Sequence, residues 1–243
     1  MADRELVERI LNDPALRTER PADPQYTKAA AGLMAELDGL VPDLARFGLP
    51  LDYVQDLYLP AIVKYDEQGN EVSRRPVDYR AAVPVLLKWL PEVRYYPVAE
   101  SIVRAVSVRF AKKQAVPVLL RVFRDLPPVK PEQRREVLRT SIGSALGNFA
   151  DASIADELID LAQDRSLGAA RAGIVNPGLP KTKDPRGPDV LLSLLDDPAV
   201  APYAVQSLGR LRHAPARPQL EQALTSPDEN VRAQAKKALK RLG

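Results

Sequence analysis

Apolar residues recur along much of this chain at spacings of three and four, which places them on one face of a helix. In residues 83–90 they stand at i, i+3, i+4 and i+7. A second stripe comprises Ile102, Val103, Val106 and Phe110. Proline stands early in several of these segments, where the first turn of a helix does not need its missing N–H. The pattern predicts short amphipathic helices.

The helical segments repeat at a fixed period. The hexamer AVPVLL at residues 82–87 recurs unchanged at 115–120, an offset of 33 residues. Residues 145–149 align with 207–211 at an offset of 62 residues, or two periods of 31. One helix pair per period fits both offsets, and such a pair must stack on its neighbours to cover its apolar face. The sequence therefore predicts an all-α solenoid of about five stacked antiparallel helix pairs over residues 80–243, packed as one continuous domain.

Two stretches carry a more specific pattern. Residues 183–198, KDPRGPDVLLSLLDDP, resemble the turn and first helix of HEAT repeats. Residues 226–232, SPDENVR, and the following residues 233–242 resemble the second turn and second helix. The resemblance extends from about residue 80 to the C-terminus. It implies a right-handed α-solenoid with second helices along a concave face, and a non-catalytic role as a protein-binding scaffold or adaptor.

One repeat departs from this pattern. Asn176, Pro177, Gly178 and Pro180 cannot continue a helix, so we expect the second helix of this repeat to stop near Val175. The following residues 176–186 are predicted to form a loop in place of a helix.

The first 79 residues are predicted to form a helical cap. Helical patterns cover residues 3–11, 25–38 and 40–47 approximately. Two apolar runs flank residues 66–71, whose composition is typical of a tight turn. We therefore expect a two-stranded β-hairpin near residues 59–75 that projects from the cap.

The sequence contains few residues that could support catalysis. His213 is the only histidine and lies in a turn, where it is expected to be a solvent-exposed structural residue. Cysteine is absent, and no metal-binding cluster or Gly-rich phosphate loop is present in the sequence. Gly143 and Gly147 are expected to let adjacent helices approach closely. We therefore expect no enzyme activity and no cofactor. A third function, that of a HEAT-like lyase acting on a tetrapyrrole, rests on family analogy alone, because the chain has no cysteine or second histidine to support it.

Aromatic residues gather in one region, since nine of the thirteen lie between Phe47 and Phe110. Tyrosine and arginine often dominate interface energies, which favours a contact surface there; alternatively, the rings fill the junction between the cap and the first repeat. With the cations of the predicted loop, the candidate partner-binding residues are Tyr58, Tyr65, Arg94, Tyr95, Tyr96, Lys181, Lys183 and Arg186. The expected partner is a protein; no oligomeric state is predicted.

The distribution of charge also allows a second class of partner, nucleic acid. The chain holds 35 basic and 32 acidic side chains, and a net charge of +3 does not by itself indicate a polyanionic partner. The last helix nevertheless carries Lys236, Lys237, Lys240 and Arg241 on one side. These cations either grip phosphates or keep a terminal helix soluble. The alternative function is a sequence-independent nucleic-acid binder or a HEAT-like DNA glycosylase.

The chain shows no membrane or secretory signal. Residues 1–13 alternate charged and apolar residues, and no stretch approaches the roughly 20 apolar residues that a membrane helix needs. A soluble, cytoplasmic protein is expected.

Overall fold

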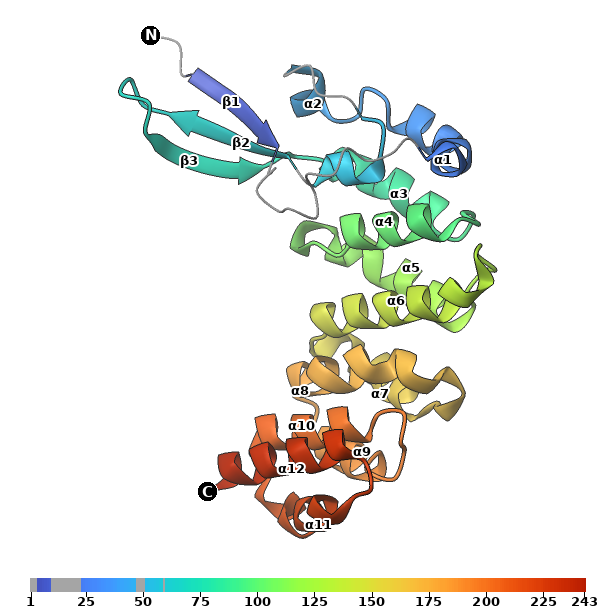
Figure 1. Cartoon of the computed structure of the whole chain (residues 1–243), viewed down its shortest axis with the longest axis vertical. Helices are drawn as coiled ribbons and strands as arrows, with labels where there is room; N and C mark the ends of the chain where they lie inside the picture. The colour runs from blue at the N-terminus through green and yellow to red at the C-terminus, as the bar shows by residue number, and fades with distance from the viewer. Residues whose placement is uncertain (1–3, 10–22, 47–50, 59) are drawn as a thin grey trace. The chain divides into compact units, whose positions relative to one another are not determined.

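The computed structural model describes residues 4–9, 23–46, 51–58 and 60–243 (Figure 1). By its contacts the chain divides into two units. Unit 1 comprises Met1–Val118 and Leu126–Arg135, and unit 2 comprises Leu119–Asp125 and Glu136–Gly243. Helices predominate in both units, which confirms the all-α class; the handedness of a superhelix and the predicted boundary at residue 80 stay predictions.

Unit 1 contains helices of both the cap and the first repeats. Its helices are α1 (Pro24–Leu37), α2 (Pro42–Arg46), α3 (Val83–Trp89), α4 (Tyr96–Val106) and the first part of α5 (Lys112–Arg124). The two cap helices expected near residues 25–38 and 40–47 are thus confirmed. α1 begins after Asp23, whose carboxylate accepts hydrogen bonds from the backbone N–H groups of Gln25 and Tyr26 at 2.9 and 3.1 Å.

The projecting β-structure has three strands. β2 (Pro60–Tyr65) and β3 (Glu71–Pro76) form the predicted antiparallel hairpin, and β1 (Arg4–Arg9) pairs antiparallel with the other edge of β2. The helix expected near residues 3–11 is therefore wrong. Its sequence, RELVER, is short enough to fit both periods, and an isolated six-residue helix is marginal where a strand edge offers backbone partners.

The hairpin turn is organised by Asp66. Its carboxylate accepts hydrogen bonds from the backbone N–H groups of Gln68 and Asn70 at 2.9 and 2.8 Å. Gly69 follows with a φ of +83°, a conformation that glycine adopts without strain. The polar run that predicted a turn thus supplies its own hydrogen bonds.

Unit 2 consists of successive helix pairs. The first helices are the end of α5, α7 (Ala155–Gln163), α9 (Gly187–Ser193) and α11 (Arg217–Gln222). The second helices are α6 (Arg135–Phe149), α8 (Leu179–Thr182), α10 (Ala201–Leu211) and α12 (Glu229–Leu242). Their apolar faces form the core, in which Leu146, Leu158, Leu191 and Leu208 are fully or almost fully buried.

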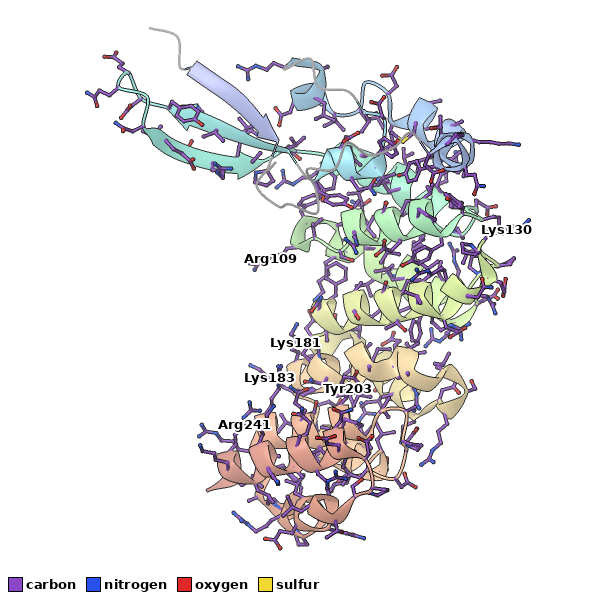
Figure 2. All side chains as sticks on the ribbon, in the orientation of Figure 1. Arg109, Lys130, Lys181, Lys183, Tyr203 and Arg241 are labelled. Atoms are coloured by element: carbon purple, nitrogen blue, oxygen red, sulfur yellow. The ribbon has the colours of Figure 1, made fainter. Side chains whose placement is uncertain are left out.

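The predicted loop at residues 176–186 is only partly correct. The helical path does break at Asn176, where φ is −147° and ψ is 114°, within a π-helical turn at Ile174–Gly178. Helix nevertheless resumes as α8, because Pro180 falls in the first turn, where its missing N–H costs nothing. The prediction of a loop is therefore wrong for residues 179–182, which form α8. This helix carries Lys181, and Lys183 follows it as its C-cap residue (Figure 2).

Two glycines of α6 let this helix approach the helical segment at residues 170–173 closely, as the sequence predicts. A Cβ atom added at Gly147 would overlap the carbonyl oxygen of Gly173, and one added at Gly143 would overlap that of Ala170. Neither neighbour can move easily, because both are backbone atoms. The i, i+4 glycine pair is thus required by packing, which agrees with its structural interpretation.

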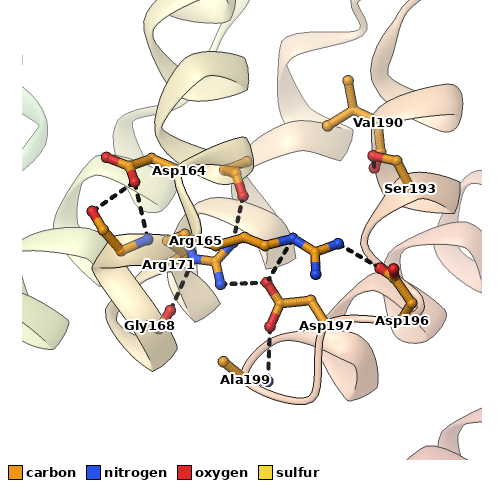
Figure 3. A network of polar contacts seen from close by, with 11 residues as sticks. Asp164, Arg165, Gly168, Arg171, Val190, Ser193, Asp196, Asp197 and Ala199 are labelled. Carbon is orange, nitrogen blue, oxygen red and sulfur yellow. Dashed lines mark hydrogen bonds and ion pairs between the residues drawn. The ribbon is translucent and has the colours of Figure 1, made fainter.

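A buried arginine ties α7 to the turn before α10 (Figure 3). Arg171 is completely buried, and its guanidinium donates to the carbonyl oxygens of Gly168 and Ala162 at 2.9 and 2.8 Å. The same guanidinium donates to Oδ2 of Asp197 at 2.6 Å, while the backbone N–H of Ala199 donates to Oδ1 at 3.1 Å. The charges are therefore paired and their hydrogen bonds largely satisfied within the core.

Asp197 should make stability depend on pH. Burial alone would raise the pKa of its carboxyl, but the hydrogen bonds from Arg171 and the Ala199 amide outweigh burial and lower the pKa below 3.8. A carboxyl with a lowered folded-state pKa stabilises the fold above its unfolded-state pKa of about 3.9, and this stability is lost as pH falls through the folded-state value. Urea unfolding between pH 7 and pH 2 should show wild type and Asp197→Asn converging below about pH 4. A difference that stays constant with pH would contradict this role.

Candidate binding surface on the second helices of unit 2

The second helices of unit 2 present a continuous polar face. On α6, Thr140, Ser144 and Asn148 are exposed at intervals of four, which places them in one stripe. The break before α8 places Asn176 where its side-chain amide donates to Oε1 of Gln206 on α10. A side-chain hydrogen bond therefore joins the segment before α8 to the second helix α10.

Tyr203 on α10 is the exposed aromatic residue of unit 2. Its side chain keeps 39% of its surface accessible, whereas the other aromatic rings of this unit, Phe123 and Phe149, are buried. Tyr203, Gln206 and Arg210 stand at i, i+3 and i+7, opposite the apolar stripe of α10. Tyr203 was not among the predicted residues because the aromatic residues cluster at residues 47–110. Its position opposite the apolar stripe was the available signal in the sequence.

Two of the three predicted cations near α8 have structural partners. The ammonium of Lys181 donates to the carbonyl oxygens of Gly147 and Asn148 at 3.3 and 3.1 Å, and so caps the end of α6. Arg186 forms ion pairs with Asp184 at 2.7 Å and with Asp156 at 2.5 Å. These contacts hold Arg186 against acidic side chains, and its hydrogen bonds lower the pKa of Asp184 to about 2.

Lys183 is the third predicted cation, and it has a counterpart one repeat later. Lys183 is the C-cap residue that follows α8 and has a φ of 57°. Arg212 is the C-cap residue that follows α10 and has a φ of 50°. Within the described part of the chain, these two are the non-glycine residues with positive φ. A side chain in this left-handed conformation costs about 1–2 kcal/mol, and glycine is the usual residue at such a helix end.

Further exposed cations continue this feature onto α12. Arg212, Lys237, Lys240 and Arg241 line one shallow hollow. Figure 2 shows Lys183 and Arg241 projecting on the same side of unit 2. We call the following five residues the basic ridge: Lys183, Arg212, Lys237, Lys240 and Arg241. In the described residues none of the five forms an ion pair.

The aromatic candidates of unit 1 are held by internal contacts. The hydroxyl of Tyr95 donates to Oδ2 of Asp23 at 3.0 Å, and the ring of Tyr96 lies 5.6 Å from the guanidinium carbon of Arg134. The guanidinium of Arg94 donates to the carbonyl oxygen of Pro91 at 2.7 Å. These three residues occupy one turn, but much of their hydrogen-bonding capacity is already used within unit 1.

The remaining two tyrosines lie on other elements of unit 1. Tyr58 is half-buried and follows the short helical turn Val54–Leu57, while Tyr65 is half-buried and ends β2 opposite Glu71. The predicted aromatic residues are thus distributed over a turn, a sheet and a helix end. Tyr79 belongs to the core, where burial raises its pKa to about 12 and its hydroxyl donates to the carbonyl oxygen of Ala105 at 3.0 Å.

The described residues contain no group of three or more His, Asp or Glu side chains placed to hold a metal ion. Nor does the described part of the chain include a helix that has both the length and the apolar character needed to cross a membrane. His213 lies half-buried in the turn between α10 and α11.

A family model of HEAT repeats matches residues 188–243. This part of the chain is therefore similar to HEAT repeats. The matched residues comprise the pairs α9–α10 and α11–α12, and they contain Tyr203 and four of the five ridge residues. No curated protein matches the chain.

Proposed function

We propose that this protein is a non-catalytic scaffold or adaptor that binds a protein partner on the second-helix face of unit 2. HEAT repeats form helical scaffolds that typically support protein interactions, and the match to this family includes α10 and α12. The observation that carries the proposal is the exposure of Tyr203 on α10, in a unit that buries its other aromatic rings.

The composition of this face supports a protein partner. Tyrosine provides a large, rigid contact surface with a polar tip, and a polar surround excludes water from such an anchor when the partner binds. The neighbouring Gln206 and Arg210 supply hydrogen-bond donors in the same stripe. This arrangement matches an interface with one aromatic anchor and a polar rim.

Nucleic-acid binding is the second candidate, because the basic ridge carries unpaired positive charge. Unit 2 as a whole holds 16 Lys and Arg against 14 Asp and Glu, so its positive charge is local. Sequence-independent nucleic-acid binders usually combine a broadly positive groove with several exposed aromatic rings. Unit 2 presents Tyr203 alone among its described aromatic residues.

Tyr203→Ala should weaken partner binding about tenfold or more, because an interfacial tyrosine commonly contributes over 1.4 kcal/mol. Tagged full-length protein would capture partners from native extract with nuclease present, and mass spectrometry would identify them. Calorimetry of an identified, purified partner would then compare wild type and Tyr203→Ala.

The matched control is Phe110→Ala, which removes an aromatic ring of similar exposure, 36%, from unit 1. Its affinity should equal that of wild type. Equal affinity of the Tyr203 variant would place the interface elsewhere, and capture that disappears with nuclease would favour the nucleic-acid function.

A further inference from the structure

We infer that the basic ridge binds an extended acidic segment of the protein partner. This inference rests on the proposed function and specifies the chemistry of the partner. It assigns a binding role to Lys183, Arg212, Lys237, Lys240 and Arg241, which lie at or near the ends of three consecutive second helices.

The first supporting observation is the strained backbone at two ridge positions. Lys183 and Arg212 adopt left-handed conformations that glycine would adopt more easily. A cation on ordinary helical backbone can complement the dipole at a helix end without this strain. Lys181 of α8, for example, donates to the last carbonyl groups of α6. Fold stability therefore does not account for a cation at these two positions, whereas an external anion would.

The second observation is that the ridge remains unpaired in a unit rich in acidic groups. Arg165, Arg171 and Arg186 each form an ion pair with an aspartate of unit 2. The ridge residues are exposed and, within the described chain, pair with no carboxylate. Three arginines of unit 2 are thus matched by carboxylates, whereas the five ridge cations are left unmatched among the described residues. Such a local positive surface favours an acidic partner by charge complementarity.

The spacing of the ridge favours a peptide over a nucleic acid. Packed helices lie about 8–10 Å apart, and an extended peptide advances about 3.3 Å per residue. An acidic residue at every third position would therefore meet one second helix after another. A nucleic-acid duplex carries one charge per about 1.7 Å, a density that a narrow ridge does not match.

A synthetic peptide tests the inference directly. The probe is a fluorescein-labelled 15-residue peptide with glutamate at about every third position and serine or glycine between them. Fluorescence anisotropy would measure its affinity for the full chain at low and moderate salt. We expect binding that weakens with salt and that falls about tenfold in the variant Lys183→Gly with Arg212→Gly.

Two controls keep this result interpretable. The ridge variant removes strain, so its thermal unfolding midpoint should equal or exceed that of wild type. The control variant Arg121→Gln with Arg124→Gln also removes two positive charges, from exposed positions of α5. It should change the affinity for the peptide less than about twofold.

Three outcomes would overturn the inference: no binding of the peptide, equal loss of affinity in both variants, or tighter binding of a 15-nucleotide single-stranded DNA than of the peptide. The proposed function is judged separately by protein capture. If the ridge variant captures the same partner as wild type with full affinity, the scaffold function stands and the role of the ridge is refuted.

Discussion

Gly147→Ala is expected to lower the free energy of unfolding by about 3 kcal/mol or more. Alanine normally stabilises a helix interior by about 1 kcal/mol relative to glycine, so propensity alone predicts the opposite sign. The added Cβ would, however, overlap the carbonyl of Gly173, and the backbone of α6 would have to move away from the segment around Gly173. Chemical denaturation followed by circular dichroism measures the difference.

Gly187→Ala is the matched control for this prediction. A Cβ atom at Gly187 meets no other atom within 4 Å, and the residue begins α9. Its stability should stay within about 0.5 kcal/mol of wild type or rise slightly. Should Gly147→Ala prove as stable as Gly187→Ala, the close approach of α6 to the Gly173 backbone would be wrong.

Arg171→Met is expected to destabilise the protein by about 3–5 kcal/mol at neutral pH. Methionine keeps most of the apolar volume but removes the closer charged partner of the Asp197 carboxylate, which is 5% exposed as a residue; Arg165, 4.0 Å from Oδ2, is the only charged partner that this carboxylate keeps among the described residues. It also removes the donors to the carbonyl oxygens of Ala162 and Gly168. Urea unfolding of both proteins gives the free-energy difference, and the variant should unfold at a markedly lower midpoint.

Arg165→Gln provides the comparison with an exposed pair. Arg165 lies 2.7 Å from Asp196, with 57% and 73% of their side-chain surfaces exposed, and its Nε makes a longer contact of 4.0 Å to Oδ2 of Asp197. Water screens this pair, so its loss should cost less than about 1 kcal/mol. In the double variant Arg171→Met with Asp197→Asn, the loss of unfolding free energy should be smaller than the sum of the losses in the two single variants, because no charge remains buried alone. Strict additivity would show that the two side chains do not act as a pair.

The repeat architecture was predictable because it depends on local periodicity. The hexamer shared by residues 82–87 and 115–120 identified the first helices, and the C-terminal pattern identified HEAT repeats. Gly143 and Gly147 were also interpreted correctly, since two glycines on one helix face indicate a close helix contact. In contrast, β1 depends on the free edge of β2, a partner more than 50 residues away, and the six residues of β1, RELVER, carry no signal of that pairing.

The candidate surface was less predictable than the fold. Lys183 was selected as part of a loop, and Arg186 was selected for the same reason, but only the structure shows that Arg186 is paired with Asp184 and Asp156. Ion pairs between residues about 30 positions apart depend on how repeats stack. The left-handed backbone at Arg212 was equally hidden, because the preferred residue for that conformation is glycine.

The interrupted second helix before α8 also sets a limit for engineering the array. Consensus repeats are readily exchanged or inserted where each unit contacts only its neighbours through regular helices. A regular second helix in place of residues 174–182 would lose the Asn176–Gln206 contact and the ammonium that caps α6. Chimeras should therefore keep residues 151–186 intact and join new repeats after α12, where α12 offers an uninterrupted helix as the template for stacking.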